Sequence, residues 1–182
     1  MKIAFIGTHG TGKTTLSYQL TAELKKQGYN ASMITELARK CPFPINKKTD
    51  EKTPLWIMTS QISHELAESH HHDIVVCDRS ILDAYIYGLI TGVTHELLEP
   101  LVDHWITTYD LLFKVPLNYD LIDDGVRDTD PKFQKEVDEK MNKLLIEKGV
   151  RCIVLPQSKQ MNFIKKILSE KAVYIPESMT ES

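Results

Sequence analysis

The chain has 182 residues, of which 42% are hydrophobic and 26% are charged, and its formal net charge at pH 7 is −3. This length fits one compact domain, and this composition excludes a fully disordered chain. The negative charge argues against a protein that is held on nucleic acid by bulk electrostatics. No apolar run approaches the ~18 residues of a membrane span, and the cysteines form no disulfide framework. We therefore expect a cytoplasmic location and no membrane partner.

Five short apolar runs alternate along the chain with amphipathic segments. The runs cover residues 2–6, 31–35, 74–77, 110–115 and 151–155, and apolar side chains at helical spacing mark residues 14–27, 54–71, 81–90 and 133–145. Residues 3–6, 74–77 and 152–155 are continuously apolar, which is typical of strands buried on both faces of a parallel sheet. The alternation predicts an α/β domain over residues 1–168, followed by a polar C-terminal tail over residues 169–182.

The most specific motif lies between the first apolar run and the first amphipathic segment. Residues 7–14 read GTHGTGKT and match the phosphate-binding P-loop pattern G-x-x-x-x-G-K-[ST]. Glycines let the backbone N–H groups turn inward around phosphate oxygens, and the following helix directs its positive end at the same anion. The residues expected to hold ATP are Gly7, His9, Gly10, Thr11, Gly12, Lys13, Thr14 and Thr15.

Two of these residues have a further expected role. Lys13 supplies a cation to the β- and γ-phosphates, which makes it a catalytic candidate, and the Thr14 hydroxyl is a candidate Mg²⁺ ligand. His9 occupies a variable position of the loop and is expected to face solvent. The loop leaves three classes of function open: a small-molecule kinase, an ATPase or GTPase switch, and an enzyme that acts on nucleic acid. The guanine-reading pattern N-K-x-D is absent from the expected positions, which disfavours guanine recognition by that route.

A second group of candidates follows the third apolar run, where the sequence reads Asp78-Arg79-Ser80. Because the carboxyl ends of parallel strands face the ligand crevice, Asp78 is expected beside the phosphate loop. Asp78 could orient Mg²⁺ or accept the proton of an attacking hydroxyl, and Arg79 could stabilise the charge of the transferred group. The alternative is that Asp78 and Ser80 only cap the next helix.

Three further residues are candidates because of their positions. Glu36 closes the second apolar run, and Arg39 follows one helical turn later, although both could instead serve a local helix or the surface. Arg127 lies beside an acid pair and a glycine, in a segment that could close over the site as a lid. In phosphoryl-transfer enzymes, an arginine delivered by such a segment offsets the charge of the transferred group.

In the segment 54–71, the expected buried stripe consists of Leu55, Met58, Ile62 and Leu66. Gln61 lies beside that stripe and could be either an exposed polar residue or a contact to the substrate.

Together these motifs resemble known kinases. Asp78-Arg79-Ser80 with residues 81–85 is similar to the acid–arginine segment of thymidylate kinases and deoxynucleoside kinases. From residue 7 to about residue 153, the chain more closely resembles the NadR-like kinase/ATPase family, which includes nicotinamide riboside kinase domains. The shared features are the phosphate loop, Glu36 with Arg39, Asp78, and residues 109–111 and 123–127.

The resemblance implies a three-layer P-loop NTPase fold, with a five-stranded parallel sheet in the order 2-3-1-4-5 and a helical lid over about residues 118–135. It further implies that Glu36 binds a sugar hydroxyl or acts as the base, that Gln61 reads a base, and that Arg127 is catalytic. Arg39 and Arg79 would contact a phosphorylated acceptor. Catalysis is thus assigned to Lys13, Asp78, Arg79, Arg127 and Glu36, substrate binding to Glu36, Arg39, Gln61 and Arg79, and Mg²⁺ to Thr14 and Asp78.

The leading interpretation is a kinase that uses ATP and Mg²⁺ to phosphorylate a nucleoside, a nucleoside monophosphate or a related metabolite. The alternatives are a P-loop ATPase or regulatory switch with a protein partner, and a polynucleotide or modified-base kinase. The sequence leaves open the acceptor, the choice of Asp78 or Glu36 as the base, and the oligomeric state, for which a homodimer is one option.

Overall fold

The structure of the protein is a computed structural model, which describes residues 1–45, 49–93, 96–117 and 130–172. Its centre is a parallel sheet of five strands in the order β2-β3-β1-β4-β5, as predicted. The strands are β1 (Lys2–Ile6), β2 (Ala31–Ile34), β3 (Ile74–Asp78), β4 (Leu111–Lys114) and β5 (Ile153–Val154). Because all strand pairs are parallel, the carboxyl ends of the strands lie at one edge of the sheet.

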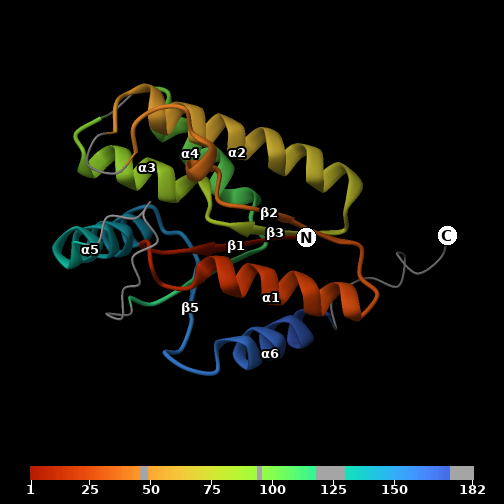
Figure 1. The fold of residues 1–182 in the computed structure, drawn as a ribbon. Coiled ribbons are helices and arrows are strands. Elements are labelled where there is room, and N and C mark those ends of the chain that lie inside the picture. The colour runs from red at the N-terminus through yellow and green to blue at the C-terminus, as the bar shows by residue number, and fades with distance from the viewer. Residues whose placement is uncertain (46–48, 94–95, 118–129, 173–182) are drawn as a thin grey trace.

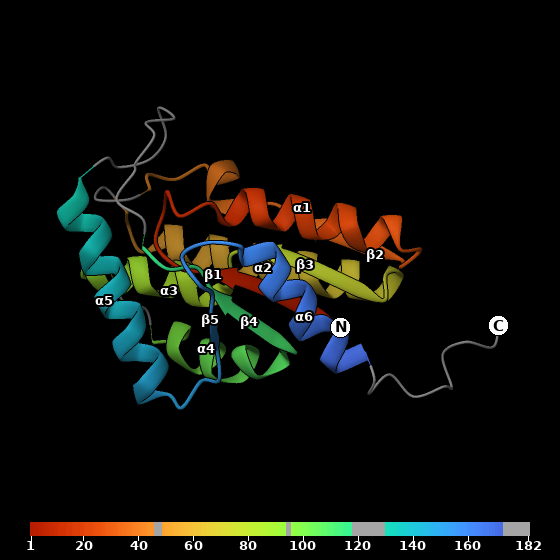
Figure 2. The ribbon, with the colours of Figure 1, turned by 90° about the horizontal axis from the view of Figure 1, so that it is seen from below.

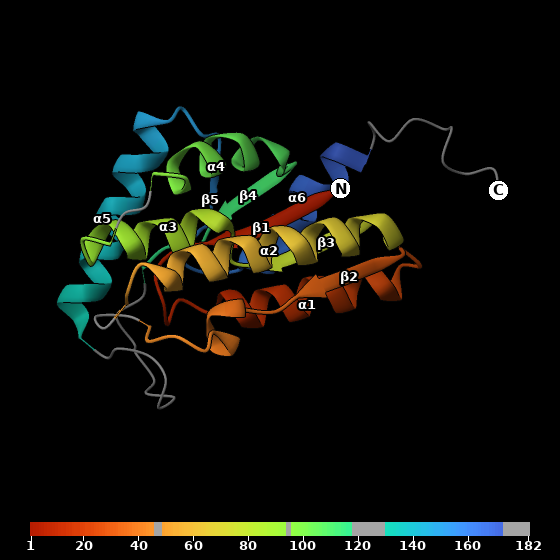
Figure 3. The same ribbon diagram turned by 90° about the horizontal axis from the view of Figure 1, so that it is seen from above.

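Helices cover both faces of this sheet and complete the three predicted layers (Figure 1). The first helical layer holds α1 (Lys13–Lys26) and α6 (Gln160–Ala172), which lie in front of the sheet in Figure 2. The second layer, which lies in front in Figure 3, is formed by α2 (Lys52–His71), α3 (Ile81–Ile90) and α4 (Leu98–Trp105), with α5 (Pro131–Glu147) packed beside α3. Two short 3₁₀ helices complete the described elements: η1 (Leu37–Lys40) after β2, and η3 (Ile106–Thr108) before β4.

The central strand β1 shows why the sequence forms two cores. Successive side chains of a strand point to opposite faces of the sheet. Ile3 and Phe5 accordingly pack with α1 and α6, whereas Ala4 and Ile6 pack with α2 to α5. All four are fully buried, so the uninterrupted apolar run is explained by helices on both sides.

Two predictions about burial are wrong. Val154 in β5 is 59% exposed, because β5 is an edge strand of only two residues, so the apolar run at 152–155 is not covered on both faces. Leu66 is 60% exposed, although it was expected in the buried stripe of α2. Gln61 and Glu65 take the buried positions instead, and the Gln61 amide donates a hydrogen bond of 2.8 Å to the Glu65 carboxylate.

The C-terminal part of the chain differs from the expected domain and tail. Helix α6 continues through residues 169–172, which were expected to begin the polar tail, while residues 173–182 lie outside the described residues. Residues 118–129, the main part of the predicted lid, also lie outside them. Within the part of the chain that the structure describes, no helix combines the length and the apolar character that a membrane crossing requires.

Candidate active site

The phosphate loop joins β1 to α1 and has the backbone shape that its glycines permit. Gly7, Gly10 and Gly12 adopt positive φ angles of 137°, 76° and 87°, a region that residues with a side chain rarely enter. Gly7 is also required by space, because a Cβ atom there would lie 2.8 Å from the carbonyl oxygen of Val115. Gly12 ends the loop in a left-handed conformation, immediately before the first residue of α1.

Lys13 is buried inside this loop. Its ammonium group donates hydrogen bonds to the Thr8 carbonyl oxygen and, at 3.2 Å, to the Thr11 hydroxyl. Burial, together with the nearby positive charge of Arg79, lowers the pKa of Lys13 to about 7. The bonds to its own loop hold the lysine where the backbone amides of the loop gather, which is the arrangement that receives a polyphosphate. Thr15, also expected to bind the nucleotide, is exposed in the first turn of α1.

Asp78, at the end of β3, lies beside the loop as predicted. Its Oδ2 accepts a hydrogen bond of 2.6 Å from the Thr14 hydroxyl. Its Oδ1 is buried and has no hydrogen-bond partner among the described residues. Magnesium prefers a few carboxylate or hydroxyl oxygens together with phosphates and water, so Thr14 and Asp78 fit a Mg²⁺ ion that arrives with a nucleotide.

The capping alternative applies to Ser80 but not to Asp78. The Ser80 hydroxyl accepts a hydrogen bond from the Leu82 amide, and the Asp83 carboxylate accepts one of 2.9 Å from the Ser80 amide, which forms a capping box at the start of α3. Asp83 also accepts a bond of 3.3 Å from the Gly7 amide. The cap of α3 therefore ties this helix to the phosphate loop and leaves Asp78 available to a ligand.

His9 does not face solvent, and that prediction is wrong. The side chain is only 3% exposed, and its Nδ1 lies 2.7 Å from the Tyr87 hydroxyl on α3. The His9 carbonyl oxygen accepts a bond of 2.8 Å from Gln134 on α5, and its ring packs against Phe133 at a centroid distance of 6.0 Å. The phosphate loop is thus fastened to α3 and α5 through one residue.

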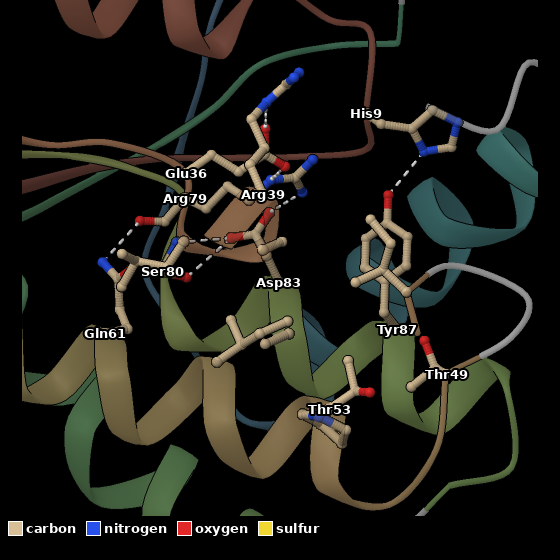
Figure 4. A pocket seen from close by; sticks show the side chains of 16 residues that line it. His9, Glu36, Arg39, Thr49, Thr53, Gln61, Arg79, Ser80, Asp83 and Tyr87 are labelled. Atoms are coloured by element: carbon tan, nitrogen blue, oxygen red, sulfur yellow. Dashed lines mark hydrogen bonds and ion pairs between the residues drawn. The ribbon is translucent and has the colours of Figure 1, made fainter. Parts of the chain in front are cut away.

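An ion-pair network lies on the other side of the loop (Figure 4). The Glu36 carboxylate accepts hydrogen bonds from Arg79 Nε at 2.6 Å and from Arg39 Nε at 3.0 Å. A second carboxylate, Asp83, lies 3.5 Å from Arg79 Nη1. These four groups carry two positive and two negative charges, so the network has no net charge.

The network fixes the protonation of Glu36 and the position of Arg79. Burial alone would raise the pKa of Glu36, but the positive charges of Arg79 and Lys13 outweigh it and lower that pKa to about 2. Burial would likewise lower the pKa of Arg79, and the Glu36 carboxylate instead raises it. Arg79 also has a φ angle of 87°, which costs about 1–3 kcal/mol for a residue with a side chain and is found mostly at functional sites.

A pocket opens beside this network, between η1, α2 and α3. Its polar lining includes His9, Glu36, Arg39, Gln61 and Arg79, which are labelled in Figure 4. Its apolar lining comes from Leu37, Ala38, Ile45, Pro54, Ile57 and Ala84. The pocket therefore has one charged end near the phosphate loop and an apolar body, which suits an organic molecule with a polar reactive group.

The structure brings together nearly every residue that the sequence singled out. Lys13, Thr14 and Asp78 meet at the loop, and Glu36, Arg39, Gln61 and Arg79 meet at the pocket. Arg127 lies outside the described residues, so its role stays a prediction.

Sequence reasoning missed Asp83 and Tyr87. The pattern Ser-x-x-Asp at residues 80–83, which is a capping-box signature, could have identified Asp83.

The model of the AAA domain family matches residues 2–161 of the chain. A search of the curated proteins found no match. Among solved structures, a crystal structure of NadR protein in complex with NR is similar with a TM-score of 0.71 and 24% identity, over 87% of this chain and 46% of that one. The chain thus spans less than half the length of that protein.

Two further solved structures are similar over almost their whole length. Deoxyadenosine kinase from M. mycoides with bound dATP has a TM-score of 0.66 and 18% identity, over 93% of this chain and 99% of that one. Thymidylate kinase from Ehrlichia chaffeensis has a TM-score of 0.63 and 20% identity, over 94% and 98%. At these identities the likeness establishes the fold, which is that of the P-loop nucleoside and nucleotide kinases.

Proposed function

The chain belongs to the AAA domain family, and from that premise we propose that it is a kinase that transfers the γ-phosphoryl group of ATP to a hydroxyl of a nucleoside or a similar neutral metabolite. The observation that carries this proposal is the ion pair of 2.6 Å between Glu36 and Arg79, at the end of the pocket that faces the phosphate loop. A P-loop that served only as a switch would not require a second, ligand-sized pocket with charged groups at that end.

The charge balance of the pocket favours an acceptor without a phosphate group. A nucleoside monophosphate would bring about two negative charges at pH 7 and would need unpaired positive charge to receive them. Among the described residues of the pocket, Arg39 and Arg79 are both paired with Glu36, and Asp83 offsets Arg79 further. A neutral hydroxyl, in contrast, can donate a hydrogen bond to the Glu36 carboxylate without disturbing either arginine.

Each group then has a definite task in the transfer. The backbone amides of the loop and Lys13 bind the β- and γ-phosphates, and Thr14 with Asp78 would hold Mg²⁺, which neutralises phosphate charge when bound. We propose that Arg127 stabilises charge on the transferred group, and that Arg79 adds to this effect while it stays paired with Glu36.

Glu36 orients the acceptor hydroxyl as a hydrogen-bond acceptor. Its pKa of about 2 makes it a weak base at neutral pH, but a loose phosphoryl-transfer transition state requires little proton removal.

A comparison of acceptors tests this proposal. The protein is incubated with MgATP and one of two classes of acceptor, and products are identified by mass spectrometry. The first class has no phosphate and consists of neutral nucleosides and the positively charged nicotinamide riboside, and the second consists of the corresponding 5′-monophosphates. We expect phosphorylated products from at least one nucleoside and none from the monophosphates. Glu36→Gln should lower kcat by about 10² to 10³-fold, the range for the loss of one oriented polar contact to the reacting group. Products from monophosphates alone would refute the proposed acceptor.

A further inference from the structure

A buried polar cluster lies behind the pocket and centres on Glu65 of α2, which is 1% exposed. Its carboxylate accepts four hydrogen bonds. Lys2 and Trp105 donate to Oε2, each at 2.7 Å, while Tyr109 at 2.6 Å and Gln61 at 2.8 Å donate to Oε1. The proposed mechanism does not use this cluster, yet a buried charge with four dedicated donors is costly to maintain without a role.

The cluster determines how the amide of Gln61 is turned. A carboxylate only accepts hydrogen bonds, so Gln61 must present its NH₂ group, and not its oxygen, to Glu65. The same nitrogen, Gln61 Nε2, also donates to the carbonyl oxygen of Arg79, at a nitrogen–oxygen distance of 3.5 Å (Figure 4). Burial raises the pKa of Tyr109 well above its ordinary value, so the hydroxyl of Tyr109 stays a donor and cannot take over the role of Glu65.

The orientation of the Gln61 amide determines which of its polar atoms is available to a ligand in the pocket. Both hydrogens of its amide are directed at protein acceptors, and its Oε1 has no hydrogen-bond partner within the described residues. Gln61 lines the pocket, so the polar atom that it can offer a ligand is a carbonyl oxygen. The pocket therefore shows a pure acceptor at this position.

We propose that Glu65 is a positioning residue that fixes the Gln61 amide, so that the pocket selects a nucleoside whose heterocycle carries an amino or carboxamide NH₂ group over one with a carbonyl or carboxylate oxygen at that place. This inference rests on the proposed function, because it names the acceptor class of the same pocket. An oxygen on the ligand would face the oxygen of Gln61 and leave both without a donor.

For the variant Glu65→Gln we predict a changed ligand preference, which tests the proposal more sharply than a loss of activity would. The single amide oxygen of the substituted side chain must face Lys2 and Trp105, which can only donate, so its NH₂ group faces Gln61 and the Tyr109 hydroxyl. That hydroxyl can accept, as it already does from the Ile81 amide. The Gln61 amide then turns over to accept from it and presents an NH₂ group to the pocket. The preference for amino-bearing ligands should therefore reverse, whereas a purely structural role for Glu65 would weaken both ligand types equally.

The test uses two pairs of nucleosides, cytidine with uridine and adenosine with inosine, each also in its 2′-deoxy form. Affinities are measured by calorimetry and kcat/KM by product formation, for the wild type, Glu65→Gln and Gln61→Leu. Glu51→Gln, an exposed substitution at the start of the same helix, is the matched control.

In the wild type and in Glu51→Gln, we expect the amino member of the accepted pair to be favoured by at least about tenfold. The preference ratio, which is the affinity or kcat/KM for the amino member divided by that for the other member, should fall to near one in Gln61→Leu and below one in Glu65→Gln. Equal binding of both members by the wild type, or an unchanged ratio in a folded Gln61→Leu protein, would overturn the inference while leaving the kinase proposal intact. Selective binding without any phosphoryl transfer would support the inference and overturn the kinase proposal.

Discussion

The buried Lys13 makes nucleotide binding dependent on a proton. Burial and the charge of Arg79 lower its pKa to about 7, so at pH 8 roughly a tenth of the ligand-free protein carries the ammonium form. A triphosphate favours that charged form and raises the pKa of Lys13, so binding draws a proton from solution. At pH 8 we expect uptake of about 0.9 proton per site, and at pH 6 uptake of about 0.1. Because only the protonated form binds well, affinity should fall about tenfold between pH 6 and pH 8.

The assay is calorimetric titration with Mg²⁺ and a non-hydrolysable ATP analogue, whose phosphates are already ionised at pH 8. The titration is repeated in buffers of different ionisation enthalpy, and the slope of the observed heat against that enthalpy gives the number of protons taken up. Lys13→Arg is the matched control, because a guanidinium stays charged throughout this range. Equal uptake by the wild type and Lys13→Arg, or none by either, would refute the reasoning.

Three further substitutions test other parts of the account. Arg127→Ala should lower kcat by about 10³-fold with little change in the affinity for ATP, and steady-state kinetics showing a change in affinity alone would remove Arg127 from the transferred group. Lys13→Ala should nearly abolish phosphoryl transfer while circular dichroism shows an intact fold, and a normal rate would exclude it from the mechanism. Gly7→Ala should destabilise the protein by about 2–4 kcal/mol in urea unfolding, and clearly more than Gly28→Ala, because both glycines have positive φ but only Gly7 meets a backbone atom. Equal losses in the free energy of unfolding would mean that the close approach of a Cβ atom to Val115 adds nothing to the cost of Gly7→Ala.

The parts of the fold that depend on local pattern could be predicted from the sequence. The continuous apolar runs at 3–6 and 74–77 identified the buried strands, because a strand between two helical layers has no polar face. Ile81–Ile90 was placed correctly, since Ser80 and Asp83 cap it locally. It was harder to predict which of two adjacent faces of α2 is buried. Leu66 was expected inside α2 and Glu65 was not. Three of the four donors that make the burial of Glu65 tolerable come from distant segments, and no local pattern records them.

The site likewise has parts that a local sequence pattern identifies and parts that depend on contacts between distant residues. The phosphate loop is recognisable because its chemistry lies within eight consecutive residues. Asp78 could be placed beside it, since both follow strands of one parallel sheet. The pairing of Arg79 with Glu36 joins residues 43 positions apart, and the burial of His9 depends on Tyr87, 78 positions away. Such contacts arise from the packing of α3 and η1 against the loop, which single-sequence patterns do not specify.

The central claim is that the γ-phosphoryl group goes to a hydroxyl in the pocket and not to water. The most direct test is a phosphate balance in one reaction with MgATP and the best nucleoside acceptor, in which ADP, phosphorylated nucleoside and free phosphate are measured together by ³¹P NMR. We predict that ADP and phosphorylated nucleoside form in equal amounts and that free phosphate stays near the level without protein. ADP matched by free phosphate, at a rate that the acceptor does not change, would contradict the account and identify an ATPase.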